Sequence, residues 1–363
     1  MSAPSRPRLL VVGAGLAGAS VAWHAAPVAS VTVIEQGDHV LAEASAQNAG
    51  MLRRLVTNAH ERALALRTQA RLEEWQRDEH QDWRERPPVR RTGAVIALEH
   101  DSPRFAAAVA DLRAAGVNVE EPAVAERARI APALREARLA RAYWLPDDGV
   151  CDAWSLGQGL LRGAARHGAT LVTARRANGL LVRAGRVVGV STERGEHEAD
   201  LVVVCAGAWA TALAASAGLV RPCVPRARHL FQSSPHPCAA GAHPWCWIDD
   251  AGLYLRPEAG GFLLSPCDET DEWPAPGPGS RRPPRDAARE LLSEKLLRLL
   301  PALGELALAS GWVGYRSFTP TREALFGPDP ELPGLAWLVG LGGSGVSTCL
   351  ALGEDTVRAL GLG

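Results

Sequence analysis

The chain has 363 residues, with 39 Lys and Arg against 40 Asp and Glu, which gives a formal net charge of −1. This balance excludes the strongly basic surface of a typical nucleic-acid-binding protein, so we expect no nucleic-acid partner. Hydrophobic residues make up 47% of the chain and charged residues 22%, a composition that excludes extensive disorder. The length predicts two lobes within one chain.

Seven cysteines lie along the chain without the C-x-x-C or Cys/His spacing of zinc and iron–sulfur sites, so we expect no metal site. An odd number of scattered thiols is typical of a reducing compartment. The apolar run at residues 9–12 is too short for a signal peptide or a membrane span. The sequence therefore predicts a cytoplasmic protein without a transmembrane segment.

The first structural signal is a buried strand that leads directly into a glycine-rich turn. Residues 9–12 are apolar at consecutive positions, as in a parallel strand that is covered on both faces. Gly13, Gly15 and Gly18 follow, then an alanine-rich helix over 16–26 and a second strand over 31–34 that ends at Glu35. This order of strand, G-x-G-x-x-G turn, helix, strand and acid predicts a dinucleotide-binding βαβ unit.

Each residue of this motif has a physical role. Gly13 permits the tight turn, Gly15 lets the backbone approach a pyrophosphate, and Gly18 allows the helix to pack closely on the strand. The first helical residues, Leu16 and Ala17, offer free N–H groups to the phosphates. Glu35, followed by Gln36, is expected to bind a ribose diol.

Further along the chain, periodicity predicts helices over 59–83, 104–115 and 155–167, and strands over 95–98, 170–172 and 187–190. Pro87 and Pro88 are expected to end the first of these helices. Residues 268–286 contain five prolines and predict an exposed loop. Lys295, the single lysine of the chain, lies in an amphipathic stretch and is expected on a solvated helix face.

A second glycine-dense turn lies near the C-terminus. A strand over 201–205 leads into Ala206 and Gly207, and a strand over 335–339 leads into the turn 340–345, followed by a helix over 347–360. Such a turn allows the backbone to approach a flat or anionic ligand, although a plain chain reversal would use glycine as well.

Four blocks of this sequence, 11–35, 44–51, 202–209 and 315–352, resemble the D-amino-acid oxidase-like superfamily of FAD-dependent amine oxidoreductases. Residues 49–52 are most similar to glycine oxidases, whereas residues 253–260 are more similar to D-arginine-type dehydrogenases, and the motifs leave both open. The resemblance implies an α/β fold. A Rossmann-like FAD-binding domain would comprise residues 1–85, 145–215 and 312–363, and a largely antiparallel-sheet substrate domain residues 86–144 and 216–311.

The resemblance also assigns cofactor contacts beyond the first turn. They are Ser45, Gln47, Asn48, Ala49, Gly50 and Met51 along the flavin and its phosphates, Ala177 at the adenine, Ala206, Gly207 and Trp209 near the cofactor, and Gly342, Gly343, Ser344, Gly345, Val346, Ser347 and Thr348 around the isoalloxazine ring.

Arg316 matches the family arginine that binds the substrate carboxylate, and a planar guanidinium suits this task because it bonds a carboxylate through two parallel N–H groups. The resemblance places Tyr254 as a catalytic-site wall over the flavin ring, with Trp247 as the alternative wall or a core residue. Met51, Arg53 and Trp247 are the expected substrate-pocket residues.

Three departures from the family pattern refine these expectations. Ser317 stands next to the arginine, where covalent-flavin relatives carry cysteine, so we expect FAD to bind non-covalently. No lysine is available over the flavin, which favours a dehydrogenase or a slow oxidase. Arg53 and Arg54 follow Met51; they contact phosphate or solvent, or one of them enters the pocket and favours an acidic substrate side chain.

The resemblance thus implies FAD-dependent oxidation of the Cα–N bond of a D-amino acid or a small amine-bearing acid to the imino acid. The electron acceptor, oxygen or a quinone, stays open. A reductase or monooxygenase that uses NAD(P)H would need a second nucleotide motif, which the sequence lacks. The remaining alternative is a flavin-binding subunit of a heteromeric amine dehydrogenase with no turnover alone.

Overall fold

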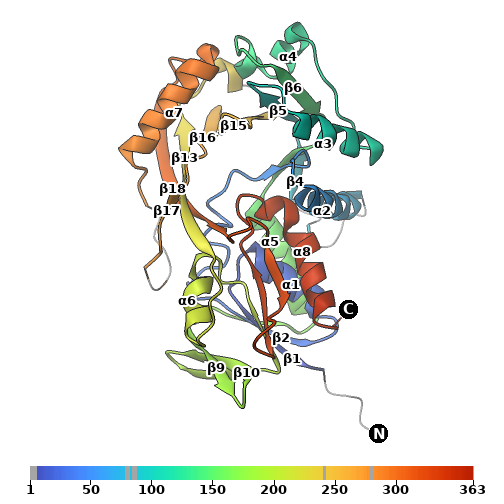
Figure 1. Cartoon of the computed structure of the whole chain (residues 1–363), viewed down its shortest axis with the longest axis vertical. Helices are drawn as coiled ribbons and strands as arrows, with labels where there is room; N and C mark the ends of the chain where they lie inside the picture. The colour runs from blue at the N-terminus through green and yellow to red at the C-terminus, as the bar shows by residue number, and fades with distance from the viewer. Residues whose placement is uncertain are drawn as a thin grey trace.

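The computed structural model describes residues 6–77, 82–83, 88–239, 243–275, 277 and 282–362. These residues form two sheet-based lobes, one above the other in Figure 1. We call them the parallel-sheet lobe, at the bottom of the view, and the antiparallel-sheet lobe, at the top.

The parallel-sheet lobe is built on six strands in the order β19-β20-β12-β1-β2-β8. They are β1 (Arg8–Val12), β2 (Ser30–Ile34), β8 (Thr170–Val172), β12 (Leu201–Val204), β19 (Leu325–Pro328) and β20 (Leu335–Val339). All neighbours pair in parallel except β19 and β20. The four apolar residues of β1 are all buried, as their consecutive pattern predicts, because layers cover both faces of the sheet.

Helices cover one face of this sheet. They are α1 (Leu16–Ala25), α2 (Ala59–Arg77), α5 (Ala153–Arg166) and α8 (Gly345–Ala359). Helix α1 contacts both α5 and α8, and α2 contacts α8. The two ends of the chain meet in this layer, where an added Cβ on Gly353 would lie 2.1 Å from the Ser20 Oγ.

The other face carries a three-stranded antiparallel sheet and a short helix. These elements are β9 (Ala177–Arg183), β10 (Arg186–Thr192), β11 (Gly195–Glu198) and α6 (Ala210–Ala215), which follows the 3-10 turn Gly207–Trp209. Leu180, Val187 and Leu213 pack from this side against Leu10 and Val12 of β1.

The antiparallel-sheet lobe has eight strands, and every pair except β5 with β14 is antiparallel. They are β5 (Ala94–Leu98), β6 (Arg141–Leu145), β13 (Val224–Ser233), β14 (Trp245–Ile248), β15 (Leu253–Glu258), β16 (Gly261–Ser265), β17 (Thr270–Asp271) and β18 (Leu308–Phe318). Helix α7 (Asp286–Leu299) covers one face, and α3 (Pro103–Ala114) and α4 (Val124–Ile130) lie at its far end. A small sheet of β3 (Met51–Leu52), β7 (Gly149–Cys151) and β4 (Val89–Arg91) completes the fold.

Strand β18 runs from Leu308 to Phe318, across the domain boundary predicted at residues 311 and 312, and pairs with β13 along that whole length. One sequence expectation needs adjustment. The predicted loop 268–286 contains strand β17, because Arg226 and Ala227 of β13 pair with it. Parts of this loop, and the predicted end of the 59–83 helix with Pro87, lie outside the described residues.

Lys295 also differs from expectation. Its Nζ donates to the backbone carbonyls of Gly252 (2.8 Å) and Pro266 (2.7 Å), so the side chain links α7 to two loops and does not simply face solvent. In the described part of the chain, no helix combines the length and apolar character needed to cross a membrane.

Candidate functional site

The first glycine turn adopts the tight geometry that its sequence predicts. Gly13 has a φ of +105°, which favours glycine, and its N–H donates to the Ile34 carbonyl at 2.8 Å. An added Cβ on Gly18 would lie 1.9 Å from the Gly13 carbonyl oxygen, so only glycine allows α1 to sit this close to the turn. The Glu35 carboxylate accepts the N–H of Ala14 at 2.8 Å, which holds the acid beside the turn.

The second glycine turn lies between β20 and α8 and faces the first. Gly340 and Gly342 have φ values of +74° and +56°, and the Gly342 N–H donates to the Ser317 carbonyl at 3.0 Å. That hydrogen bond ties the turn to the end of β18. Gly342 and Gly343 line a cavity together with Gly15, as the interpretation of this turn as a ligand-binding turn predicts.

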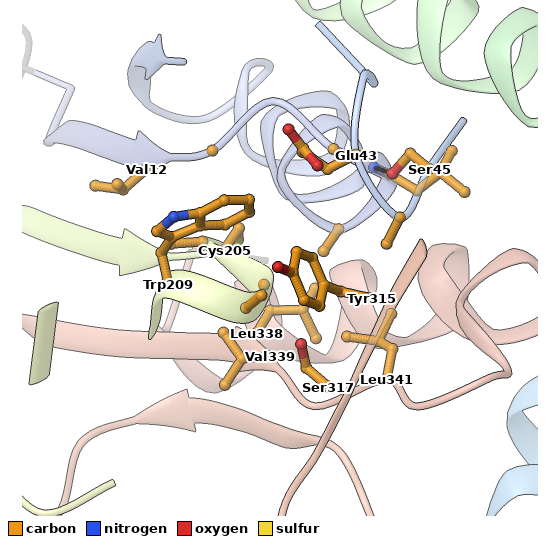
Figure 2. Close-up of a pocket in the computed structure, with 18 of the residues that line it drawn as sticks. Val12, Glu43, Ser45, Cys205, Trp209, Tyr315, Ser317, Leu338, Val339 and Leu341 are labelled. Atoms are coloured by element: carbon orange, nitrogen blue, oxygen red, sulfur yellow. Dashed lines mark hydrogen bonds between the residues drawn. The ribbon is translucent and has the colours of Figure 1, made fainter. Parts of the chain in front are cut away.

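This cavity has a volume of about 320 Å³ and lies in the parallel-sheet lobe at the carboxyl ends of its strands. Most of the predicted cofactor contacts line it: Gly13, Gly15, Leu16, Ala17, Glu35, Gln36, Ser45, Asn48, Ala177, Ala206, Gly207, Trp209, Gly342, Gly343, Gly345 and Val346. Arg316 lines the same space. Figure 2 shows Trp209 and Tyr315 facing the cavity, with Glu43 and Ser45 beside them.

Eight predicted cofactor residues do not line the cavity, namely Gly18, Gln47, Ala49, Gly50, Met51, Ser344, Ser347 and Thr348. Several of them shape its wall through hydrogen bonds. The Gln47 carbonyl accepts from Arg316, the Gly50 N–H donates to Asn48 Oδ1 at 2.7 Å, and the Ser344 hydroxyl bonds Glu61.

The sequence interpretation missed other lining residues, including Glu43, Arg175, Arg176, Pro274 and Tyr315. Tyr315 and the two arginines are sequence neighbours of predicted contacts, so a wider window around those contacts would have found them. Pro274 had no such signal. It belongs to residues 272–275, which we call the strap; the strap comes from the antiparallel-sheet lobe and is held by a hydrogen bond of 3.0 Å from Trp209 Nε1 to the Ala275 carbonyl.

Arg316 is a buried cation at the junction of the two lobes. Its side chain donates to the backbone carbonyls of Tyr315 (2.9 Å) and Gln47 (2.7 Å), and no acidic side chain among the described residues forms an ion pair with it. Burial lowers the pKa of Arg316 to about 10, which leaves the group charged at neutral pH. These two hydrogen bonds use two of the five N–H donors of the guanidinium.

Tyr254 and Trp247 form an aromatic pair beside Arg316. Their ring centroids are 4.9 Å apart, and Tyr254 is 3% exposed. The charge of Arg316 acts on Tyr254, whose pKa burial raises. Met51 packs against the same cluster. These side chains do not line the cavity just described, so their role as substrate wall remains a prediction.

Arg53 and Arg54 take different positions. The Arg54 Nε lies 2.6 Å from the buried Asp148 carboxylate, and Arg54 does not line the cavity. Burial raises the pKa of Asp148 to about 6, against the effect of this arginine. Arg53 lies 4.2 Å above the Trp247 ring, with Asp249 at 3.4 Å and Glu61 at 3.5 Å. Arg53 therefore reaches the aromatic pair, but with two carboxylates already beside it.

The family model described as FAD dependent oxidoreductase (DAO) matches residues 8–359, nearly the whole chain. The chain belongs to this FAD-dependent oxidoreductase family. The chain is 35% identical to a glycine oxidase from Pseudomonas aeruginosa over 153 aligned residues. These residues make up 42% of this chain and 39% of the relative. It is 25% identical to a mitochondrial sarcosine dehydrogenase from Homo sapiens over 97% of this chain and 39% of the relative. The chain thus spans about two fifths of these two relatives.

Two solved structures share the fold of this chain. The L-proline dehydrogenase from P. horikoshii superposes with a TM-score of 0.82 at 22% identity, over 99% of this chain and 94% of that chain. An iminodiacetate oxidase from Chelativorans sp. BNC1 gives a TM-score of 0.78 at 25% identity, over 97% and 95% of the two chains.

FAD is the cofactor of the DAO family, and the cavity fits it. Glycines keep side chains out of the space at both turns, and an added Cβ on Gly15 would lie 3.0 Å from Ser45 Oγ. Buried guanidinium nitrogens of Arg175 lack a hydrogen-bond partner at the same cavity. The Leu16 N–H already donates to Ser45 Oγ at 2.9 Å, so it is not free as the sequence predicted. The rest of the α1 N-terminus and Ser45 would hold the pyrophosphate, Glu35 the ribose, and the turn 342–345 the flavin ring.

Proposed function

We propose that this protein oxidises the Cα–N bond of an amino acid that carries one carboxylate, giving the imino acid. FAD, when bound, accepts the hydride that leaves Cα, and the amine loses a proton, so that a C=N double bond forms. The imino acid then hydrolyses in water to the oxo acid and ammonia or an amine. The similarity to a glycine oxidase, a sarcosine dehydrogenase and an iminodiacetate oxidase supports an amine-bearing acid as substrate.

The observation that carries the proposal is the state of Arg316. A guanidinium that is 7% exposed and has no acidic partner in the described structure is an uncompensated buried charge. A substrate carboxylate would supply the missing negative charge and two charge-assisted hydrogen bonds. The two backbone carbonyls that Arg316 already contacts hold its planar group in one orientation, so a bound carboxylate would fix Cα in one place.

The surrounding side chains favour a small or neutral substrate side chain. Arg53 faces Asp249 and Glu61, so this end of the aromatic pair offers no unpaired cation for a second carboxylate. No lysine lines the FAD cavity, and Nζ of Lys295 is committed to two carbonyls on another part of the fold. This arrangement favours a dehydrogenase or a slow oxidase.

The test is anaerobic mixing of the purified yellow protein with D-amino acids, glycine, sarcosine, L-proline and iminodiacetate. Bleaching of the flavin absorption by at least one amino acid is expected, and oxygen consumption with that substrate then separates an oxidase from a dehydrogenase. A protein that keeps its colour with every compound would contradict the proposal. It would favour a flavin-binding subunit of a heteromeric amine dehydrogenase without turnover alone.

A further inference from the structure

The loop between β8 and β9 is fixed against the end of β2. The Ala174 N–H donates to the Gly37 carbonyl at 2.9 Å, and the Arg175 N–H donates to the Glu35 carbonyl at 2.8 Å. Ala174 has a φ of +46°, an unfavourable conformation for a residue with a Cβ, which the two hydrogen bonds hold in place. The two hydrogen bonds place the loop directly beside the acid of the dinucleotide motif.

This position brings Arg175 and Arg176 to the cavity at the same end as Glu35 and Gln36. Neither arginine forms an ion pair or a side-chain hydrogen bond with any described residue. Nε and Nη1 of Arg175 are buried and have no hydrogen-bond partner among the described residues. Burial of a polar group without a partner is unfavourable, and a positive charge increases the penalty. Arg175 is thus incomplete without a ligand.

The place in the fold determines which part of the cofactor this ligand is. In a βαβ dinucleotide fold, the acid at the end of the second strand contacts the ribose of the adenosine half, and the pyrophosphate lies at the helix N-terminus. Because Arg175 is anchored to the backbone of Glu35, it lies at the adenosine half. Adenine offers nitrogen acceptors and a π face, and the ribose offers oxygen acceptors, all of which suit a planar guanidinium.

We propose that the Arg175 side chain recognises the adenosine half of FAD, and so makes this protein select FAD over flavins that lack adenosine. The inference concerns the cofactor only. The test of this proposal does not depend on the amino-acid substrate proposed above, because it measures equilibrium binding of the cofactor without turnover.

The experiment uses the holoprotein. Dilution releases FAD, whose fluorescence gives the Kd, and competition by added ADP or FMN then reports each half of the cofactor separately. Arg175→Met keeps the length of the side chain and removes its donors. We expect the Kd of FAD and the competition constant of ADP to rise about 10-fold or more, while that of FMN changes less than about twofold.

Arg194→Met is the matched control, because Arg194 is exposed, lies outside the cavity and forms no ion pair within the described residues. It should leave all three constants unchanged. An unchanged Kd of FAD in Arg175→Met would overturn the proposal, as would an equal loss for ADP and FMN, which indicates a distorted cavity. Arg175→Lys should recover only part of the affinity. Full recovery would also overturn the proposal, because it would show that charge alone, acting on the pyrophosphate, is responsible.

Discussion

Replacement of Arg316 tests the substrate anchor most directly. Arg316→Met keeps the apolar volume and removes the guanidinium, so the substrate carboxylate would be buried without its partner. Loss of one member of a buried, hydrogen-bonded charge pair costs about 2–5 kcal/mol. At about 1.4 kcal/mol for each factor of ten, kcat/KM for the amino acid should fall about 30- to 5,000-fold. The kcat/KM of Arg316→Lys should lie between the values of the wild type and of Arg316→Met, because lysine keeps the charge but not the two parallel N–H donors.

A substrate without a carboxylate provides the internal control for this prediction. The ratio of kcat/KM for glycine over methylamine, or for sarcosine over dimethylamine, measures the contribution of the carboxylate. We expect Arg316→Met to abolish this preference while the methylamine value stays within a few fold. Since Arg316 also bonds the Gln47 carbonyl beside the cavity, the Kd of FAD is measured in parallel. A ratio that persists in Arg316→Met would refute the reasoning, because another group would then bind the carboxylate.

Four other sites test the cofactor cavity and the helical layer behind it. Gly18→Ala places a methyl group 1.9 Å from the Gly13 oxygen and should lower Tm, whereas Gly343→Ala meets no atom within 4 Å and should keep Tm but raise the Kd of FAD. Trp209→Phe removes the hydrogen bond to the strap. Stopped-flow fluorescence should then show larger rate constants for both the dissociation and the association of FAD. A change in the dissociation rate constant alone would indicate that Trp209 acts only as a direct contact of FAD. Burial lowers the pKa of His24 to about 4, so below pH 6.5 the unfolded chain binds more protons at this residue than the folded chain does. The free energy of unfolding should therefore fall by up to about 3 kcal/mol as the pH is lowered from 6.5 to 4. His24→Gln should flatten that part of a urea denaturation profile, and an unchanged slope would assign it to other groups.

The two glycine turns show how far local reasoning reaches. Gly13 needs a positive φ, and Gly18 leaves no room for a Cβ, so backbone sterics alone require glycine at these places. Both constraints act within a few residues of chain, which is why the motif predicted the strand, the turn and the helix correctly. Arg316 was predicted from the family resemblance and not from local sterics; in the structure the second turn bonds its neighbour Ser317, and Arg316 lines the cavity.

The directions of individual side chains were harder to predict. Arg53 and Arg54 are adjacent in sequence, but one lies over Trp247 and the other pairs with Asp148, which is 94 positions away along the chain. Lys295 lies on a helix with an amphipathic pattern, yet it binds two carbonyls from distant loops. Such outcomes depend on partners that only the assembled fold supplies.

The sequence by itself determined the cofactor fold, because close approach of backbone to a dinucleotide requires glycine at fixed spacings and buried parallel strands require continuous apolar runs. The tertiary structure decided which side chains complete the site. Arg175 joins the cavity because two backbone hydrogen bonds hold its loop against β2, and Pro274 joins it because the strap crosses from the other lobe. These contacts link segments far apart in the chain, and the energies that select them act only when those segments are brought together.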